Sequence, residues 1–206
     1  MKKILILFAH PRLDRSEINI EQKVAVQNLP GITLVDLYAE YPTFDIDVDQ
    51  EQQRLLENDI IIFQHPVYWY SCPAILKEWQ DLVLEYGFAY GAQGDALKEK
   101  IFFNAVTCGG RDETYTKKGM NHRTLRELFA PFEQTADLCQ MRYLPPFALY
   151  AAGHARAENR LKKHIDDYKM LLTALVEDRM NLKKAEKQKN LSDNLNLLIQ
   201  AKQEAW

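Results

Sequence analysis

Residues 59–84 have the sequence DIIIFQHPVYWYSCPAILKEWQDLVL, and this segment decides the fold. It opens on a short apolar run, residues 59–63, which is typical of a strand buried on both faces of a parallel sheet. It closes on residues 74–84, whose apolar side chains recur at helical spacing. The segment therefore predicts a buried strand, a connecting loop and a helix.

The connecting loop is rich in aromatic residues and proline. Tyr68, Trp69 and Tyr70 are consecutive, and Pro66 and Pro73 flank them. The loop lies at the carboxyl end of a strand, where open α/β sheets bind their ligands. Flat rings on a loop stiffened by proline suit a flat, partly apolar ligand. The alternative is that the rings cap the core, but the position of the loop favours a ligand.

The rest of the chain alternates in the same way. Strands are expected at residues 3–8, 32–37, 59–64, 100–107 and 142–150, and helices at 16–28, 49–57, 73–86, 122–137 and 155–178. This alternation predicts βαβ units with right-handed crossovers. We expect a flavodoxin-like three-layer α/β/α fold with a five-stranded parallel sheet in the order 2-1-3-4-5. Pro131 is expected to divide the fourth helix, and Pro145-Pro146 indicates an edge strand or a bulge.

The composition excludes several classes of protein. The 206 residues are enough for one sizeable domain, and the net charge of −3 gives no reason to expect a nucleic-acid partner. Three cysteines without a CxxC spacing argue against a disulfide framework or a zinc site, and reduced thiols fit a cytoplasmic protein. No stretch approaches the roughly 18 apolar residues that span a membrane. Nothing in the sequence indicates a metal site.

The chain changes character near residue 180. Residues 183–189 are too polar to pack, and four apolar residues then fall on one helical face: Leu191, Leu195, Leu198 and Ile199. Ser192 or Asp193 is a plausible N-cap for such a helix. We therefore divide the chain into a domain of residues 1–179 and a segment of residues 180–206. The terminal helix could dock on its own domain, on a twin subunit or on a partner, or it could fray.

The loop after the first strand has the character of an anion site. A helix with Ser16 as its N-cap points free backbone N–H groups at this loop, an arrangement that suits phosphate. His10, Arg12 and Arg15 would add hydrogen-bond donors and charge. The chain has neither a Walker lysine-threonine motif nor GxGxxG, so an ATPase or a Rossmann dinucleotide site is not indicated. Taken alone, His10 could be a structural histidine at a strand end.

The loop after the fourth strand contains the paired glycines Gly109 and Gly110. Glycines at a strand end let the backbone approach a ligand closely, and their N–H groups can donate to a planar heterocycle. Paired glycines alone are more often an ordinary turn. At the switch point of this sheet, however, one loop would hold phosphate, one would wall a ring and one would donate hydrogen bonds to it. A flavin nucleotide fits these three demands.

From about residue 3 to residue 175 the chain resembles the flavodoxin-like NAD(P)H:quinone oxidoreductases. It is most similar to the small bacterial ancillary subunits of glutathione-gated potassium efflux antiporters. The fragments that carry the resemblance are Ala9-His10-Pro11, Ser16, Asn19, Asp36-Leu37-Tyr38, Tyr41-Pro42, Phe44, Gln64-His65-Pro66, Trp69-Tyr70-Ser71, Pro73, Leu76-Lys77, Trp79, Gly87-Phe88-Ala89-Tyr90-Gly91, Thr107, Gly109-Gly110 and Leu144-Pro145-Pro146. Each fragment is weak alone, but the ordered set is specific.

The resemblance implies a homodimer that binds FMN or FAD. It places one group of residues around the phosphates: His10, Ser16, Glu17, Ile18 and Asn19. It places a second group around the isoalloxazine ring: Pro66, Val67, Tyr68, Trp69, Tyr70, Thr107, Cys108, Gly109 and Gly110. In larger quinone reductases of the family, a tyrosine and a histidine beyond the double glycine stabilise the reduced flavin. Tyr115 matches the tyrosine, whereas the histidine position falls on Asn121, next to His122.

The activity implied by this resemblance is hydride transfer from NADH or NADPH through the flavin to a quinone. The candidate catalytic residues are Tyr115 and His122, and the alternative for Tyr115 is an ordinary loop tyrosine. A second hypothesis is a regulatory ancillary subunit on the cytoplasmic domain of a potassium efflux antiporter, which would bring the protein to the inner membrane. The two hypotheses are compatible. A flavodoxin-type one-electron carrier is disfavoured, because carriers are usually strongly acidic and have a hydroxyl-rich phosphate loop.

Overall fold

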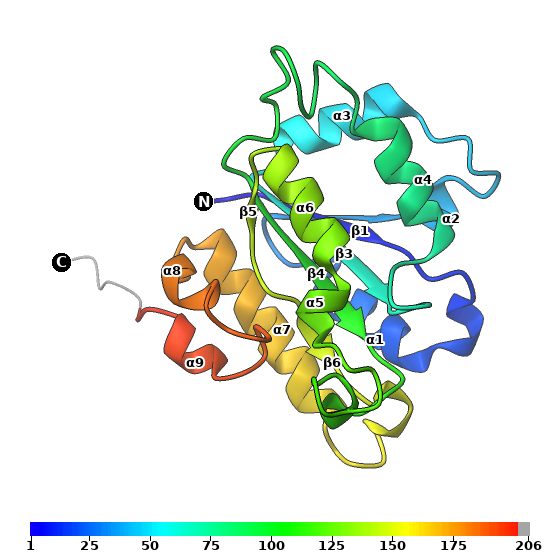
Figure 1. Ribbon diagram of the computed structural model, residues 1–206, viewed down its shortest axis with the longest axis vertical. Helices are drawn as coiled ribbons and strands as arrows, with labels where there is room; N and C mark the ends of the chain where they lie inside the picture. The colour runs from blue at the N-terminus through cyan, green and yellow to red at the C-terminus, as the bar shows by residue number, and fades with distance from the viewer. Residues whose placement is uncertain (202–206) are drawn as a thin grey trace.

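A parallel sheet forms the middle layer of the protein (Figure 1). The computed structural model describes residues 1–201, without the side chain of Glu17. The strands are β1 (Ile4–Phe8), β2 (Ile32–Asp36), β3 (Ile60–Pro66), β4 (Ile101–Thr107), β5 (Arg142–Tyr143) and β6 (Phe147–Leu149). Their order is β2-β1-β3-β4-β5, with β6 paired to β4, so the predicted order 2-1-3-4-5 is confirmed.

Helices cover both faces of this sheet. The α-helices are α1 (Glu17–Val26), α2 (Leu37–Glu40), α3 (Val48–Glu57), α4 (Ala74–Val83), α5 (Leu125–Leu128), α6 (Ala130–Leu138), α7 (Leu161–Val176), α8 (Leu182–Ala185) and α9 (Leu195–Leu198). Short 3-10 turns are η1 (Leu13–Arg15), η2 (Asp112–Thr114) and η3 (Ala152–His154). The helix expected at 155–178 begins later, because residues 155–160 form a turn closed by Arg160 N–H on the Ala155 carbonyl at 2.8 Å.

Alternate side chains of the strands enter two separate cores, as the period of two in a strand requires. Leu5 and Leu7 of β1 enter the core that α3, α4 and α6 cover. Ile4 and Ile6 enter the opposite core, which is built with α1, α7, α8 and α9. Both faces of the central strands are therefore apolar, which is why their sequences are continuous apolar runs.

Proline divides two of the expected elements. Pro131 lies in the first turn of α6, so the helix expected at 122–137 is split into α5 and α6. Pro145 and Pro146 lie between β5 and β6, so the strand expected at 142–150 is also two pieces. Both pieces pair with β4, which makes this segment an interrupted edge of the sheet. Proline has no backbone N–H and cannot donate a hydrogen bond to a neighbouring strand, which explains the interruption.

The segment of residues 180–201 packs against the domain, and we call it the C-terminal segment. The expectation that residues 183–189 are too polar to pack is wrong, because Ala185 is fully buried and Glu186 forms an ion pair with Arg142. The helix after it is also shorter than expected. It begins after Asn194 rather than at Ser192 or Asp193, and it spans only α9.

The C-terminal segment covers the outer edge of β6. Leu191 N–H donates to the Pro146 carbonyl at 2.9 Å, and Ala148 N–H donates to the side chain of Asn190 at 3.0 Å. Ser192 Oγ approaches the Ala148 carbonyl at 3.4 Å. These bonds satisfy polar backbone groups that an open edge strand would leave exposed. Among the docking alternatives, the structure therefore places this segment on its own domain. The domain boundary at residues 179/180 stays a prediction.

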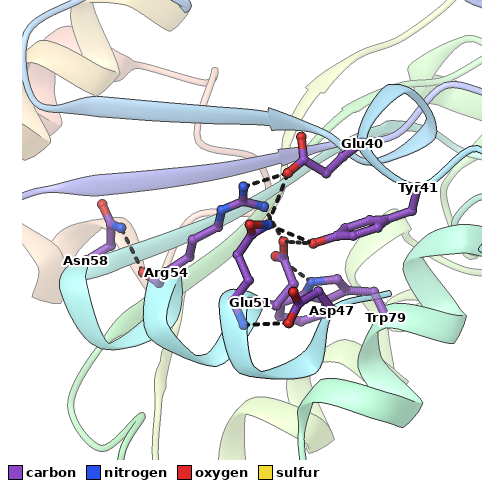
Figure 2. A network of polar contacts seen from close by, with 8 residues as sticks. Glu40, Tyr41, Asp47, Glu51, Arg54, Asn58 and Trp79 are labelled. Atoms are coloured by element: carbon purple, nitrogen blue, oxygen red, sulfur yellow. Dashed lines mark hydrogen bonds and ion pairs between the residues drawn. The ribbon is translucent and has the colours of Figure 1, made fainter. Parts of the chain in front are cut away.

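A buried carboxylate ties α3 to α4 and to the end of α2 (Figure 2). Glu51 is fully buried and accepts hydrogen bonds from Tyr41 Oη at 2.7 Å and from Trp79 Nε1 at 2.8 Å. Arg54 forms ion pairs with Glu51 and with Glu40. Burial, together with the nearby Glu51 carboxylate, raises the pKa of Tyr41 to about 12. The charge of Glu51 is therefore compensated on several sides, as a buried ion requires.

Within residues 1–201, no helix combines the length and the apolar character that are needed to cross a membrane.

Candidate functional site

Three loops meet at the carboxyl edge of the sheet, at the switch point between β1 and β3. The His10 and Tyr68 rings meet edge to face at 6.1 Å between centroids, which joins the first loop to the second. Val67 N–H donates to the Thr107 carbonyl at 2.8 Å, which joins the second loop to the third. Asn19 Nδ2 contacts Thr107 Oγ1 at 3.3 Å, which joins the third to the first. The loops therefore form one rim.

The N-terminus of α1 presents unused backbone donors to this rim. Within the described part of the chain, the N–H groups of Ile18 and Asn19 have no hydrogen-bond acceptor. Ser16 occupies the expected N-cap position, but its hydroxyl accepts from Asn19 Nδ2 at 2.7 Å instead of capping the helix. The free amides and the positive end of the helix dipole make this an anion site. The side chain of Glu17 lies outside the described residues.

His10 is a buried neutral donor rather than a source of charge. Burial lowers its pKa, and the nearby carboxylates of Asp14 and Asp36 offset this only in part. Its Nδ1 accepts from the Arg12 N–H at 3.2 Å, so the proton of the neutral ring is assigned to Nε2. Nε2–H is then the group that His10 can offer to an anion.

The two arginines of the first loop are exposed. Arg12 pairs with Asp14 at 2.9 Å, and the Nε of Arg15 lies 3.9 Å from the same carboxylate. The charge that Arg12 was expected to add to the anion site is therefore offset by a neighbouring carboxylate. Backbone amides and the His10 Nε2–H remain as the main donors of this loop.

The second loop is a tight hairpin turn that holds its aromatic rings outward. Tyr68 and Ser71 exchange backbone hydrogen bonds of 3.2 Å and 2.9 Å, and the two residues between them have positive φ angles, 49° at Trp69 and 64° at Tyr70. Two-residue turns of this kind favour Asn-Gly, because other residues are strained there. Trp69 is 94% exposed. Strain of this kind is concentrated at functional sites.

We expect the double replacement of Trp69 by Asn and Tyr70 by Gly to raise the free energy of unfolding of the flavin-free protein by about 1 to 2 kcal/mol, because the left-handed backbone is then relieved. Urea denaturation measures this change. Tyr86→Asn, at another exposed tyrosine, is the control and should change stability by less than about 0.5 kcal/mol. Unchanged or lower stability in the double variant would show that the turn is unstrained.

The third loop leaves open space at its glycines. A Cβ built on Gly109 would meet nothing within 4 Å, and the Gly109 N–H has no acceptor among the described residues. A Cβ on Gly110 would press on Thr114 at 2.8 Å. Cys108, in contrast, is buried, and its N–H donates to the Leu149 carbonyl at 2.9 Å. The loop is therefore anchored at Cys108 and open at Gly109.

Tyr115 folds back over this loop. Burial raises its pKa to about 12, and the Cys108 thiol and the Tyr70 hydroxyl beside it act in the same direction. The hydroxyl therefore keeps its proton at neutral pH and can donate a hydrogen bond. Its ring packs on Tyr150 with centroids 5.4 Å apart. The sequence reasoning missed Tyr150, although its place at the end of the last strand was a signal.

His122 is the second candidate catalytic residue. It is exposed, has a φ of 52°, and its backbone N–H donates to the Gly119 carbonyl at 3.1 Å. No contact of its ring with the three loops occurs in the part of the chain that the structure describes. That part also contains no group of three or more His, Cys, Asp or Glu placed to hold a metal ion. The rim itself consists of amide, imidazole and phenol donors beside aromatic rings.

Comparison with known proteins matches this chain to one family. The family is described by its flavodoxin-like fold, and the match covers residues 2–172. The glutathione-regulated potassium-efflux system ancillary protein KefG of Yersinia pseudotuberculosis serotype O:1b is 43% identical over 166 residues, which cover 81% of this chain and 91% of that protein.

Two solved structures share the fold at high similarity. General stress protein 14 of Treponema denticola, solved in complex with FMN, has a TM-score of 0.79 and 38% identity and covers 84% of this chain and 99% of its own. An NADPH-quinone reductase from P. pentosaceus has a TM-score of 0.71 and 36% identity and covers 81% of this chain and 96% of its own. The family match covers residues 2–172, the sheet has the strand order of that fold, and these relatives agree. The chain therefore belongs to the flavodoxin-like family.

Proposed function

We propose that this protein is a flavin-dependent NAD(P)H:quinone oxidoreductase that binds FMN. The observation that carries the proposal is the rim of three linked loops, with unused N–H donors at Ile18, Asn19 and Gly109 and open space beside Gly109. A similar protein was solved in complex with FMN, and another is named an NADPH-quinone reductase, which supports the same assignment.

The residues of the rim fit a flavin mononucleotide. The amides of Ile18 and Asn19 and the His10 Nε2–H would hold the phosphate, because all are neutral or dipolar donors at a helix N-terminus. Tyr68, Trp69 and Tyr70 would border the ring on one side and exclude water there. The Gly109 N–H would donate to the polar edge of the ring. The backbone could approach the ring closely because glycine leaves open the space that a side chain would fill.

The bound flavin would supply the redox chemistry, accepting a hydride from NAD(P)H and delivering two electrons to a quinone. The contribution of Tyr115 is a donor that stays protonated, since its pKa is raised to about 12 by burial. A fixed donor beside developing negative charge stabilises it without reorganisation. For this reason we assign to Tyr115 the stabilisation of negative charge at the polar edge of the flavin ring. His122 stays a candidate from resemblance alone.

Purified protein tests the proposal directly. We expect a yellow preparation whose released chromophore has the mass of FMN; the mass of FAD would correct the cofactor. NADH and NADPH are then compared as donors with menadione as acceptor. Steady two-electron turnover supports the enzyme, and flavin binding without quinone turnover with either donor would contradict it.

Gly109→Val is the sharpest variant for the cofactor site. The branched side chain would enter the open space beside the loop, so we expect flavin affinity to fall at least about tenfold, or 1.4 kcal/mol. Gly153→Val is the matched control, because a Cβ there also meets nothing within 4 Å and Gly153 lies in η3, outside the rim. Fluorescence titration of the flavin-free proteins measures both. Equal affinity in both variants would place the ring elsewhere.

A second candidate function is that of an ancillary subunit of a potassium efflux antiporter, supported by the 43% identity to KefG. We also propose a homodimer, since the exposed Trp69 at the rim gives a second copy an apolar surface to cover. A cytoplasmic location follows from both functions, with placement at the inner membrane where an antiporter is bound. Co-purification with the antiporter, and light scattering for the dimer, test these assignments.

A further inference from the structure

The end of β3 carries a buried histidine directly before the aromatic loop. His65 is fully buried on the face of the sheet that α6 covers (Figure 1), and its ring centroid lies 6.1 Å from those of Phe129 and Phe132. Both ring nitrogens have polar neighbours. Nδ1 lies 2.9 Å from the Pro66 carbonyl oxygen, and Nε2 lies 3.2 Å from Oδ1 of Asn104. Polar contacts on both sides give this ring a defined orientation.

The Pro66 carbonyl is buried at a point where the strand ladder offers it no donor. Ala9 N–H donates to the Gln64 carbonyl at 3.0 Å, so the next donor in register from the β1 side would be residue 11. That residue is Pro11, which has no N–H. A buried backbone carbonyl needs a partner, and the ring of His65 stands where the missing backbone donor would have been.

The contact with Pro66 fixes the position of the proton on the His65 ring. Burial lowers the pKa of His65, and the hydrogen bonds to Pro66 and Asn104 offset this only in part, so the ring is neutral and carries one N–H. Because a carbonyl oxygen only accepts, that N–H is at Nδ1. Nε2 then has a free lone pair and needs a donor of its own.

Asn104 supplies this donor when its side-chain amide is rotated by half a turn. The amide is fully buried, with Oδ1 3.2 Å from His65 Nε2 and Nδ2 3.2 Å from Tyr143 Oη. Exchanging Oδ1 and Nδ2 places an N–H against Nε2 and a carbonyl oxygen against the Tyr143 hydroxyl. Burial raises the pKa of Tyr143, so its hydroxyl keeps a proton to donate. Each of these polar atoms then faces a partner of opposite character.

We infer that His65 is a positioning residue of the rim, which holds the Pro66 carbonyl through Nδ1–H. The hydrogen bonds run in one direction, from Tyr143 on β5 to Asn104 on β4, to His65 on β3 and to Pro66, and bonds in such a chain strengthen one another. They fix the start of the second loop and, with it, the aromatic turn of residues 68–71. The chain does not deliver a proton to the rim, because it ends on a carbonyl oxygen. In its bearing on the flavin, the inference rests on the proposed function.

The protonation of the ring is measured by NMR of the histidine ring nitrogens in the full-length, flavin-free protein. At neutral pH we expect His65 to have a protonated Nδ1 and an unprotonated Nε2. This measurement uses the natural chain, so it does not depend on a variant that folds. A proton on Nε2 alone, or on both nitrogens, would overturn the inference.

His65→Asn and His65→Leu are a matched pair, because both side chains branch at Cγ and only asparagine can place an N–H where Nδ1 was. The readout is amide hydrogen exchange at Val67, whose N–H donates to the Thr107 carbonyl at 2.8 Å. Relative to the β1 amides, which report global unfolding, we expect Val67 to exchange at least about tenfold faster in the leucine variant. A purely structural role would change both sets of amides alike. The same relative exchange at Val67 in both variants would contradict positioning by the Nδ1 donor.

Binding of FMN to the same two variants tests the link to the flavin. A loop that spends less time in its competent arrangement lowers the apparent affinity by that fraction, so we expect FMN to bind at least about tenfold more weakly to the His65→Leu variant than to the His65→Asn variant. Equal affinities would overturn the role of His65 at the flavin site. If the natural chain binds no FMN, the proposed function fails, whereas the protonation and exchange results still decide whether His65 holds the loop.

Discussion

Replacing Glu51 by alanine is expected to lower the free energy of unfolding by about 3 to 5 kcal/mol, the range typical of removing one partner of a buried ion pair. Tyr41 Oη and Trp79 Nε1 both donate to this carboxylate, at 2.7 Å and 2.8 Å, and would be left without an acceptor (Figure 2). Each buried donor without a partner costs about 1 to 3 kcal/mol. Denaturant titration measures the loss.

The control for Glu51 is Glu57→Ala, less than two turns further along α3 at its exposed end, where a change of less than about 0.5 kcal/mol is expected. A triple variant, Glu51→Leu with Tyr41→Phe and Arg54→Met, removes the carboxylate together with two of its partners and leaves Trp79 Nε1 without an acceptor. Because apolar replacement of a buried ion pair is often close to neutral, it should recover part of the loss. If Glu51→Ala were as stable as Glu57→Ala, the carboxylate would not hold α3 to α4.

Leu191→Ala is expected to lower the free energy of unfolding by about 2 to 5 kcal/mol, the usual range for a leucine deleted from a core. Leu191 is fully buried in the same core as Tyr168 and Leu172 of α7, although it lies near the end of the chain. Its N–H also holds the edge of β6 through the Pro146 carbonyl. For a chain of this size, each kcal/mol lowers the melting temperature by about 2 to 4 °C.

Leu197→Ala, in the same segment, is the control for Leu191. Leu197 is 71% exposed in α9, so its removal should change stability by less than about 0.5 kcal/mol. Thermal unfolding of the two variants, side by side, distinguishes a docked segment from a loose one. Equal and small effects would mean that the C-terminal segment does not contribute to the core in solution.

The layered fold follows from local patterns in the chain. The apolar runs of β1, β3 and β4 can be satisfied only by burial on both faces, and helical spacing between them supplies the covering layers. Parallel strands with right-handed crossovers then bring the loops after Phe8, Pro66 and Thr107 to one edge. This is why the meeting of the three loops could be predicted from sequence without any contact being known.

The electrostatic character of the site could not be predicted in the same way. His10 was expected to bring charge, yet burial makes it neutral, and Asp14 compensates Arg12. These outcomes depend on how far each group is from water and on which side chains face it. The positive φ angles of Trp69 and Tyr70 belong to a two-residue turn that Tyr68 and Ser71 close with backbone hydrogen bonds, and these residue types do not predict such a turn.

The C-terminal segment shows most clearly which features follow from local sequence patterns and which depend on the folded structure. Its leucines were visible as an apolar pattern, so the need to bury them was evident from composition and spacing alone. The surface that buries them was not, because it is assembled from α7 and the sheet only when the chain is folded. Periodicity is a local property and specifies strands, helices and their order. Docking depends on residues far apart in the chain, such as Asn19 with Thr107, 88 positions away, or Leu191 with Pro146, and only the folded packing brings them into contact.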